Sequence, residues 1–196
     1  MPRDDWETNT IDKIFQREGL YPKERISTIL DVACGLSLKS QYLDADIRVG
    51  VDIYKPYLAK IDAKVPFTTV VGDVRRLDDL FIEKSFDLVL MLDIIEHLEK
   101  PDSLALLQTA ERLAKVAVII ETPEGFVPQN IDIWGHGGDE FQTHRCGWEK
   151  AELEELGFHV IRRPYTMQNV RRHTEIDVPV NIHLLDGIKY VSPRTS

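Results

Sequence analysis

The sequence predicts an α/β protein whose core is a doubly wound, mostly parallel sheet of seven strands with helices on both faces. Two observations support this fold class. Short apolar runs alternate with helical patterns at least five times along the 196 residues, as expected for strands joined by helical crossovers. Three of these runs, within residues 29–37, 49–52 and 70–73, stop at an acidic or small residue. Ligands of open α/β sheets bind at the carboxyl ends of such buried strands.

Seven segments are predicted to be strands because each is a short apolar run bounded by turn residues or acids. In chain order they are residues 27–33, 47–52, 67–72, 87–92, 116–120, 158–162 and 181–190. A bend at Asp186 and Gly187 is compatible with the last strand, because glycine often marks an irregularity in a strand pattern.

Five segments show the periodicity or the boundary residues of helices. They are residues 7–19, residues 36–42, a helix that begins at residues 54–56, a helix from residue 101 or 102 to about 114, and residues 148–156. Pro56 lies near the first turn of the third helix, where proline is tolerated. Gly157 is the expected end of the fifth helix.

The chain is most simply one domain over residues 1–196, since its length is that of an ordinary single domain. Residues 1–24 are predicted to form an N-terminal helical extension. Residues 123–146 are rich in Gly, Pro, Asn and Asp and are too long for a simple connection. Loops of that length are usually functional or disordered, so this segment is interpreted as a substrate-side loop.

The composition limits the possible partners. The net charge of −9 disfavours a nucleic acid, because binding to phosphates depends largely on Lys and Arg. Two cysteines cannot form a disulfide framework, and the chain shows neither a signal peptide nor an apolar run long enough to cross a membrane. These features favour a cytoplasmic protein with no membrane partner, and they leave the oligomeric state open.

The strand ends are typical of a nucleotide site. Gly35 follows a buried strand and precedes a predicted helix, so the backbone can approach a ligand closely there. Asp52 follows Asp31 by 21 residues, which is the spacing at which an acid meets ribose hydroxyls in nucleotide-binding βαβ units. Asp73 and Asp93 follow two further strands. Four acids around one glycine repel a pyrophosphate but suit a cationic ligand, and S-adenosylmethionine carries a sulfonium and an ammonium group.

At this level of detail the chain resembles the class I S-adenosylmethionine-dependent methyltransferases, which have a Rossmann-like fold. The matching pieces are residues 30–35, 50–52, 72–74, 86–98 and 154–158, so the similarity covers about residues 25–163. The resemblance implies transfer of the methyl group of S-adenosylmethionine to an acceptor. The chain departs from the family pattern at Ala33 and Ser37, where the family usually has glycine.

The resemblance also implies which residues hold the cofactor. Asp31 and the backbone of Ala33, Cys34 and Gly35 would flank the methionine part, and Asp52 would hold the ribose. The remaining implied contacts are Ile53, Asp73 and Val74 at the adenine, and Leu92 and Asp93 near the methyl donor.

Glu96 and His97 follow the fourth strand and lie beside the expected methyl group. His97 and His144 are candidate general bases, because histidine exchanges protons near neutral pH. Glu96 is the third catalytic candidate. The alternatives are that the turn only shapes the pocket, or that Asp93, Glu96 and His97 bind a divalent ion, as similar stretches do in some methyltransferases. The further metal ligand would come from His136 or His144.

The predicted function is methyl transfer from S-adenosylmethionine to an unidentified small-molecule acceptor. One alternative is an S-adenosylmethionine-binding regulatory protein or inactive homologue, suggested by Ala33 and Ser37. A nicotinamide-dependent oxidoreductase is a second rival, supported only by the general strand-and-acid pattern. It is disfavoured because only one of the three glycines of a dinucleotide loop is present.

Overall fold

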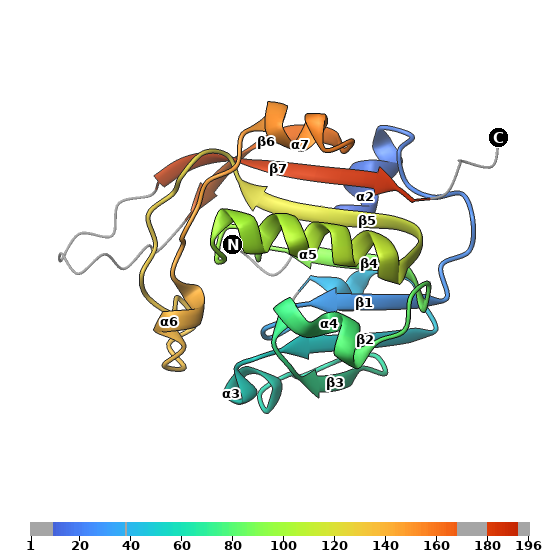
Figure 1. Ribbon diagram of the computed structural model, residues 1–196, viewed down its shortest axis with the longest axis horizontal. Coiled ribbons are helices and arrows are strands. Elements are labelled where there is room, and N and C mark those ends of the chain that lie inside the picture. Colours follow the sequence, from blue (N-terminus) through green and yellow to red (C-terminus); the bar gives the residue numbers. More distant parts are fainter. Residues whose placement is uncertain (1–9, 38, 168–179, 192–196) are drawn as a thin grey trace.

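The computed structural model describes residues 10–37, 39–167 and 180–191. Its centre is a seven-stranded sheet in the order β3-β2-β1-β4-β5-β7-β6 (Figure 1). The strands are β1 (Thr28–Val32), β2 (Ile47–Asp52), β3 (Thr68–Val71), β4 (Phe86–Leu92), β5 (Ala114–Pro123), β6 (His159–Met167) and β7 (Val180–Tyr190). β7 is antiparallel to both neighbours, and the other pairings are parallel. The predicted mostly parallel, Rossmann-like sheet is therefore confirmed.

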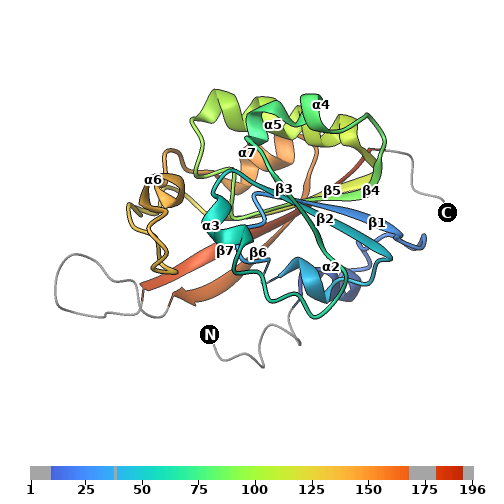
Figure 2. The ribbon, with the colours of Figure 1, turned by 90° about the horizontal axis from the view of Figure 1, so that it is seen from below.

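Helices cover both faces of the sheet (Figure 2). One face carries α4 (Leu77–Leu80), α5 (Lys100–Leu113) and α7 (Lys150–Glu155), and the other carries α2 (Ile11–Arg17) and the 3₁₀ turn η1 (Ser40–Tyr42). The remaining short elements are α3 (Lys55–Leu58), η2 (Val74–Arg76) and α6 (Asp139–Gln142). The doubly wound arrangement agrees with the prediction.

The core consists of two apolar layers, one on each side of the sheet. Leu106, Leu107 and Leu113 of α5 pack with Val89 and Met91 of β4 in one layer. Leu88 and Leu90 of the same strand pack with the buried face of α2 in the other. Alternate residues of a strand point to opposite faces, which explains why β4 is apolar from Leu88 to Leu92. Its burial on both faces fixes the centre of the sheet.

The prediction of a helix at residues 36–42 is wrong. The described residues of this segment form only the short 3₁₀ turn η1. Ser37 has a φ of +53°, and an α-helix requires a negative φ. The side chains of Ser37 and Ser40 hydrogen-bond each other over 2.9 Å, and Ser40 also donates to Asp31. These local bonds compete with helical backbone bonds, as serine often does.

Each predicted strand lies where a strand is found, but two strands in the second half of the chain are longer than predicted. β5 extends to Pro123 and β6 extends to Met167 because antiparallel pairing with β7 continues to those residues. β7 is continuous through Asp186 and Gly187, with no bend. A Cβ on Gly187 would lie 2.8 Å from the side chain of Ile120, so glycine there permits close packing of the strands.

The predicted helices differ mainly at their ends. The first helix is described over Ile11–Arg17 within the predicted 7–19, and residues 7–9 lie outside the described residues. α4 and η2 were not predicted, and α6 lies within the predicted loop 123–146. In the described part of the chain, no helix is both long and apolar enough to cross a membrane.

Candidate functional site

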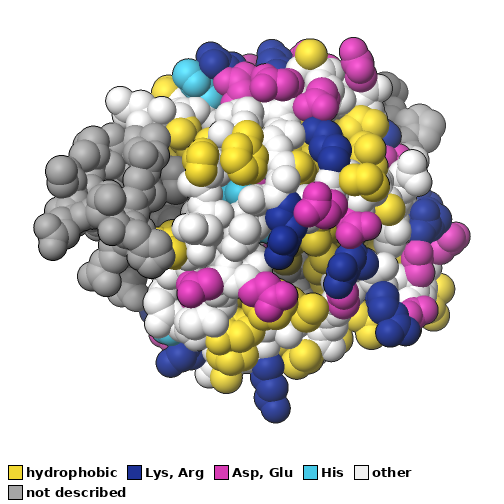
Figure 3. All heavy atoms as spheres, turned by 60° about the vertical axis from the view of Figure 1, so that its left-hand side comes forward, with side chains coloured by type: hydrophobic (Ala, Val, Ile, Leu, Met, Phe, Trp, Pro, Cys, Tyr) yellow, Lys and Arg dark blue, Asp and Glu magenta, His cyan; other side chains and the backbone are white. Residues whose placement is uncertain are grey.

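A cavity of about 990 Å³ lies at the carboxyl edge of the parallel strands. Figure 3 turns this edge toward the reader and shows apolar, acidic and basic side chains around the hollow. The cavity brings together all the residues predicted to hold the cofactor or to act in catalysis. Those predicted to hold the cofactor and found in its lining are Asp31, Ala33, Cys34, Gly35, Asp52, Ile53, Asp73, Val74, Leu92 and Asp93. Glu96, His97 and His144 line the same cavity.

The loop after β1 forms the floor of one end of the cavity. Ala33, Gly35 and Ser37 all have a positive φ, between 51° and 56°. The ring of Trp134, from the segment before α6, lies against Gly35 so closely that a Cβ on Gly35 would be 2.5 Å from it. Glycine is therefore required here by close approach as well as by conformation. The long loop thus contacts the cofactor side of the cavity directly.

Asp52 ties this loop to the end of β2. Its carboxylate accepts hydrogen bonds from the backbone N–H of Gly35 at 2.8 Å and of Tyr54 at 2.7 Å. Each carboxylate oxygen can accept a further bond, so the group can still receive hydroxyl donors from a ligand. Burial raises the pKa of Asp52, and these two backbone donors oppose that effect.

Asp31 lies at the carboxyl end of β1 and is 5% exposed. Burial raises the pKa of Asp31 to about 7, the bond from Ser40 opposes this, and the nearby Asp52 carboxylate adds to it. An uncompensated buried carboxylate favours a positively charged neighbour. Asp31 is thus chemically suited to a cationic ligand.

Asp73 caps η2 at the end of β3. Its carboxylate accepts bonds from the backbone N–H of Arg75 at 2.9 Å and from the Arg75 guanidinium at 3.0 Å. The hydrogen bond from the Arg75 side chain is the main reason why the pKa of Asp73 lies below its usual value. Asp73 therefore lines the cavity as an ionised group that already has one partner.

A buried ionic network lies at the ends of β4, β5 and β7. It was not predicted from the sequence. The ammonium group of Lys39 pairs with Asp93 and Glu121, and Arg163 pairs with Glu121 and Asp186. Burial alone would raise the pKa of Glu121, but the positive charges of Lys39 and Arg163 outweigh it and lower that pKa to about 2. The sequence signals for this network were Asp93 and Glu121, the acids at the ends of β4 and β5.

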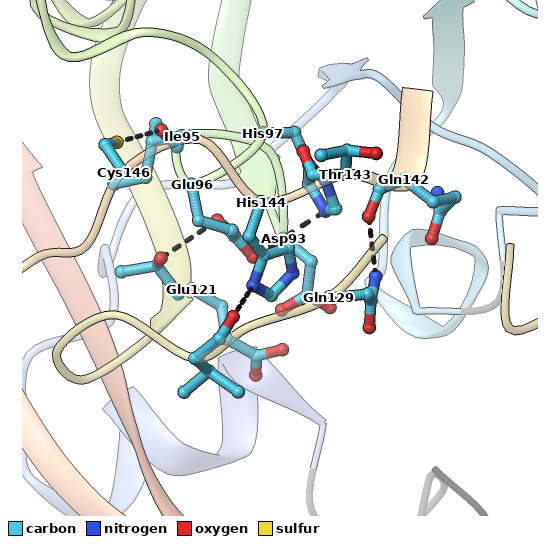
Figure 4. A network of polar contacts seen from close by, with 12 residues as sticks. Asp93, Ile95, Glu96, His97, Glu121, Gln129, Gln142, Thr143, His144 and Cys146 are labelled. Carbon is cyan, nitrogen blue, oxygen red and sulfur yellow. Dashed lines mark hydrogen bonds and ion pairs between the residues drawn. The ribbon is translucent and has the colours of Figure 1, made fainter. Parts of the chain in front are cut away.

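Glu96, His97 and His144 form a second polar cluster in the cavity. Figure 4 shows the Glu96 carboxylate and the two imidazole rings turned toward one another. Nε2 of His97 lies 4.0 Å from Oε1 of Glu96, and the two ring centroids are 4.6 Å apart. The hydroxyl of Thr122 donates to the other Glu96 oxygen at 2.9 Å. The sequence predicted all three members of this cluster.

Backbone hydrogen bonds hold the two segments of this cluster together. The N–H groups of Arg145 and Cys146 donate to the carbonyl oxygen of Glu96 at 2.8 and 3.2 Å. The N–H of His144 donates to the carbonyl oxygen of Gln129 at 2.9 Å. The segment before α7 is thereby fixed against the turn after β4, which places His144 beside Glu96 and His97.

All three side chains are buried, and burial dominates their acid–base properties. It lowers the pKa of His97 to about 3, lowers the pKa of His144, and raises the pKa of Glu96 to about 8. The nearby Asp93 carboxylate raises the pKa of Glu96 further. Both imidazoles are therefore neutral near pH 7, so each keeps one nitrogen lone pair.

His136, one of the two predicted additional metal ligands, lies elsewhere. Its ring is 6.2 Å from that of Tyr57, and its carbonyl oxygen accepts a bond from Tyr54. Asp132 accepts the backbone N–H groups of Trp134, His136 and Gly138, which fixes this turn. Asp93 is paired with Lys39. The structure therefore brings His144 rather than His136 to Glu96 and His97, and Asp93 is not among the residues whose potential ligand atoms lie within 4.8 Å of one another.

One comparison with known proteins gives a family match over part of the chain. The profile of a family described as a methyltransferase domain matches residues 29–116. A search of curated proteins found no match.

Many solved structures share the fold. One is a proposed methyltransferase from Bacillus halodurans C-125, which is 16% identical with a TM-score of 0.66, over 92% of this chain and 98% of that one. Another is magnesium protoporphyrin IX methyltransferase from Synechocystis PCC 6803, solved with bound S-adenosylmethionine. It is 15% identical with a TM-score of 0.54, over 95% and 79% of the two chains. A methyltransferase dependent on S-adenosylmethionine from Archaeoglobus fulgidus is 17% identical with a TM-score of 0.55, over 94% of each chain. At these identities the structural likeness establishes the fold.

Proposed function

We propose that the chain is a class I S-adenosylmethionine-dependent methyltransferase that methylates a small-molecule acceptor inside the cavity. Two findings support this: residues 29–116 match a methyltransferase domain, and the fold is that of solved methyltransferases. The observation that carries this proposal is the shared lining of that cavity. One cavity of about 990 Å³ is lined both by the strand-end loops and by the Glu96–His97–His144 cluster. Ligand pockets usually measure about 300–1,000 Å³, so the cavity can hold a cofactor and a modest acceptor together.

The cofactor end is assigned to the loops after β1, β2 and β3. Asp52 is proposed to accept the ribose hydroxyls, since its carboxylate keeps acceptor capacity beyond the two backbone bonds. Asp31 and the backbone of residues 33–35 would face the methionine part, where the buried carboxylate suits the ammonium group. Asp73 and Val74 would face the adenine, with Ile53 against its ring.

The acceptor end is assigned to the turn after β4 and the segment 123–146. Leu92 and Asp93 lie between the two ends and would face the methyl donor. Glu96, His97 and His144 line the wall beyond them. The net charge of −9 supports a small acceptor over a nucleic acid.

The chemistry asked of the protein is modest. The sulfonium already activates the methyl group, so the protein mainly supplies proximity and an in-line approach for the acceptor atom. A proton acceptor is needed only for an acceptor that must lose a proton. The neutral imidazoles of His97 and His144 have the lone pairs for this step, and their role as bases stays a prediction.

The proposal is tested with isotope-labelled S-adenosylmethionine. The purified chain is incubated with the low-mass fraction of a cell extract and, separately, with its macromolecular fraction. We expect label and S-adenosylhomocysteine only with the low-mass fraction. Label confined to macromolecules would refute the small acceptor. Cofactor binding without transfer to either fraction would refute catalysis and favour the binding-only alternative.

A pair of variants checks the cofactor end. Asp52→Ala should weaken S-adenosylhomocysteine binding at least about tenfold, because hydrogen bonds to a charged group contribute about 1.5–3 kcal/mol. Asp62→Ala removes an exposed carboxylate from the loop after α3 and should leave binding unchanged. Circular dichroism shows whether each variant folds, since Asp52 also holds two backbone N–H groups. Equal affinity in a folded Asp52→Ala variant would contradict the assignment.

A further inference from the structure

We propose that Glu96, His97 and His144 bind a divalent transition-metal ion at the acceptor end of the cavity. One potential ligand atom from each side chain lies within 4.8 Å of the others, and within the described ranges no further group of three such residues has this geometry. The cluster comes from two segments, residues 96–97 and the segment of His144, that the fold brings together. The proposal goes beyond methyl transfer, because it concerns the binding of an ion by these three side chains.

The ring nitrogens have the hydrogen-bond pattern of metal ligands. Nδ1 of His144 lies 2.5 Å from the carbonyl oxygen of Val127, and Nδ1 of His97 lies 3.3 Å from that of Thr143. A carbonyl oxygen can only accept, so the contact with Val127 places the proton of His144 on Nδ1 and leaves Nε2 its lone pair. The longer contact with Thr143 favours the same tautomer of His97. Metal-ligating histidines almost always donate their other N–H to a carbonyl, a carboxylate or water, which fixes the tautomer and the ring orientation.

The carboxylate of Glu96 is held in a matching way. The Thr122 hydroxyl occupies one of its oxygens at 2.9 Å, and the other oxygen, Oε1, faces His97. The Glu96 side chain is 3% exposed, and the two histidines are 8% and 9% exposed. Three donors that are buried among fixed partners and open to one cavity form a prepared site rather than a solvated surface cluster.

The spacing is close to what an ion requires. Zinc and similar ions bind nitrogen and oxygen ligands at about 2.0–2.2 Å, so their ligand atoms lie about 3–3.5 Å apart. The three groups would have to approach one another by about 1 Å. The backbone bonds from residues 145 and 146 to the Glu96 carbonyl already fix the two segments, so rotation of the side chains can supply this movement.

The donor set selects the kind of ion. Two imidazoles and one carboxylate suit zinc, manganese, iron or cobalt, whereas magnesium and calcium prefer oxygen ligands. Three protein ligands leave coordination positions open to the cavity, where an acceptor oxygen could bind. A bound ion would use the same Nε2 lone pairs that a general base needs, so His97 and His144 would then act as ligands instead.

The test measures binding of the metal itself. The full chain, purified without an affinity tag and treated with a chelator, is titrated calorimetrically with Zn²⁺, Mn²⁺ and Mg²⁺. Co²⁺ is added in a separate experiment because its visible spectrum reports the coordination geometry. We expect one transition-metal ion per chain, with Mg²⁺ binding much more weakly, and a Co²⁺ spectrum that indicates nitrogen ligands.

Four variants separate the site from adventitious binding. Glu96→Gln and His144→Gln should each weaken transition-metal binding at least about a hundredfold. His159→Gln removes an exposed histidine on β6 and should change nothing. Thr122→Val keeps all three ligands and removes only the hydroxyl partner of Glu96, so about tenfold weaker binding is expected.

The proposal is overturned if the wild-type chain shows no saturable binding of one ion. It is also overturned if binding persists unchanged in folded Glu96→Gln and His144→Gln variants. Should both variants fail to fold, Thr122→Val decides, and unchanged affinity there counts against the site. Titration with S-adenosylhomocysteine in parallel keeps this result separate from the proposed methyl transfer, since the cofactor end contains none of the three ligands.

Discussion

Asp31 links the cofactor end of the cavity to the stability of the fold. Burial raises the pKa of its carboxyl group from 3.8 to about 7. Each tenfold change in an acid dissociation constant corresponds to about 1.4 kcal/mol. Ionising Asp31 in the folded chain therefore costs about 4 kcal/mol more than ionising it in the unfolded chain, which is a large fraction of the stability of an ordinary domain.

The direction of the effect follows from proton binding. Between pH 3.8 and about 7 the folded chain keeps the Asp31 proton that the unfolded chain has released. The contribution of Asp31 to the free energy of unfolding therefore falls as the pH rises through this window, and it stays low at higher pH. Asp31→Asn removes this titration and keeps an acceptor oxygen for the Ser40 hydroxyl. The stability of the variant relative to the wild type should rise by up to about 4 kcal/mol between pH 4 and pH 8.

Urea denaturation at a series of pH values, followed by circular dichroism, measures this difference. Other buried groups titrate in both proteins, so they cancel in the comparison. Asp46→Asn changes an exposed carboxylate and serves as the control. A stability difference between Asp31→Asn and wild type that is constant within about 0.5 kcal/mol across this range would refute the reasoning.

If Asp31 also faces the cofactor ammonium, S-adenosylhomocysteine should bind wild type more tightly at pH 8 than at pH 6. The variant should lose this dependence.

Two further substitutions test the close contact under the long loop and the buried ionic network. Gly35→Ala should abolish cofactor binding because its Cβ would lie 2.5 Å from the Trp134 ring, whereas Gly19→Ala has a similar positive φ with open space around it and should leave binding unchanged. Arg163→Met should lower the free energy of unfolding by about 3–5 kcal/mol because it leaves the buried Asp186 without its cationic partner and leaves Glu121 paired with Lys39 alone. Arg162→Met, at a half-exposed neighbour, should cost less than about 1 kcal/mol, and equal losses in urea denaturation would contradict the network.

The fold could be predicted because the sheet determines which residues must be apolar. β4 is buried on both faces, so residues 88–92 form a continuous apolar run that can be recognised without knowing the neighbouring strands. The ends of β5 and β6 could not be predicted because they depend on pairing with β7, which lies far along the chain. The helix expected at 36–42 was wrong for a similar reason. The contact of Ser40 with Asp31 is local in space but has no periodic signal in the sequence.

The cofactor end of the site could be recognised for a related reason. Its acids follow strands, and parallel strands bring their carboxyl ends to one edge. The partners of those acids could not be predicted. Lys39 and Arg163 reach Glu121 from a loop and from an antiparallel edge strand, so no spacing in the sequence connects them.

The long segment 123–146 shows why the acceptor end is harder to predict and why it is connected to the cofactor end. The sequence left open whether His136 or His144 joins Glu96 and His97. The choice depends on the backbone of a loop, where Asp132 caps one turn and holds His136 away from the cluster. Eight residues after His136, backbone bonds to Gln129 and Glu96 hold His144 and its neighbours in the cavity. The same segment also places Trp134 against Gly35, so one loop supplies lining residues to both ends of the cavity. A substitution in this loop is therefore expected to act on both ends at once.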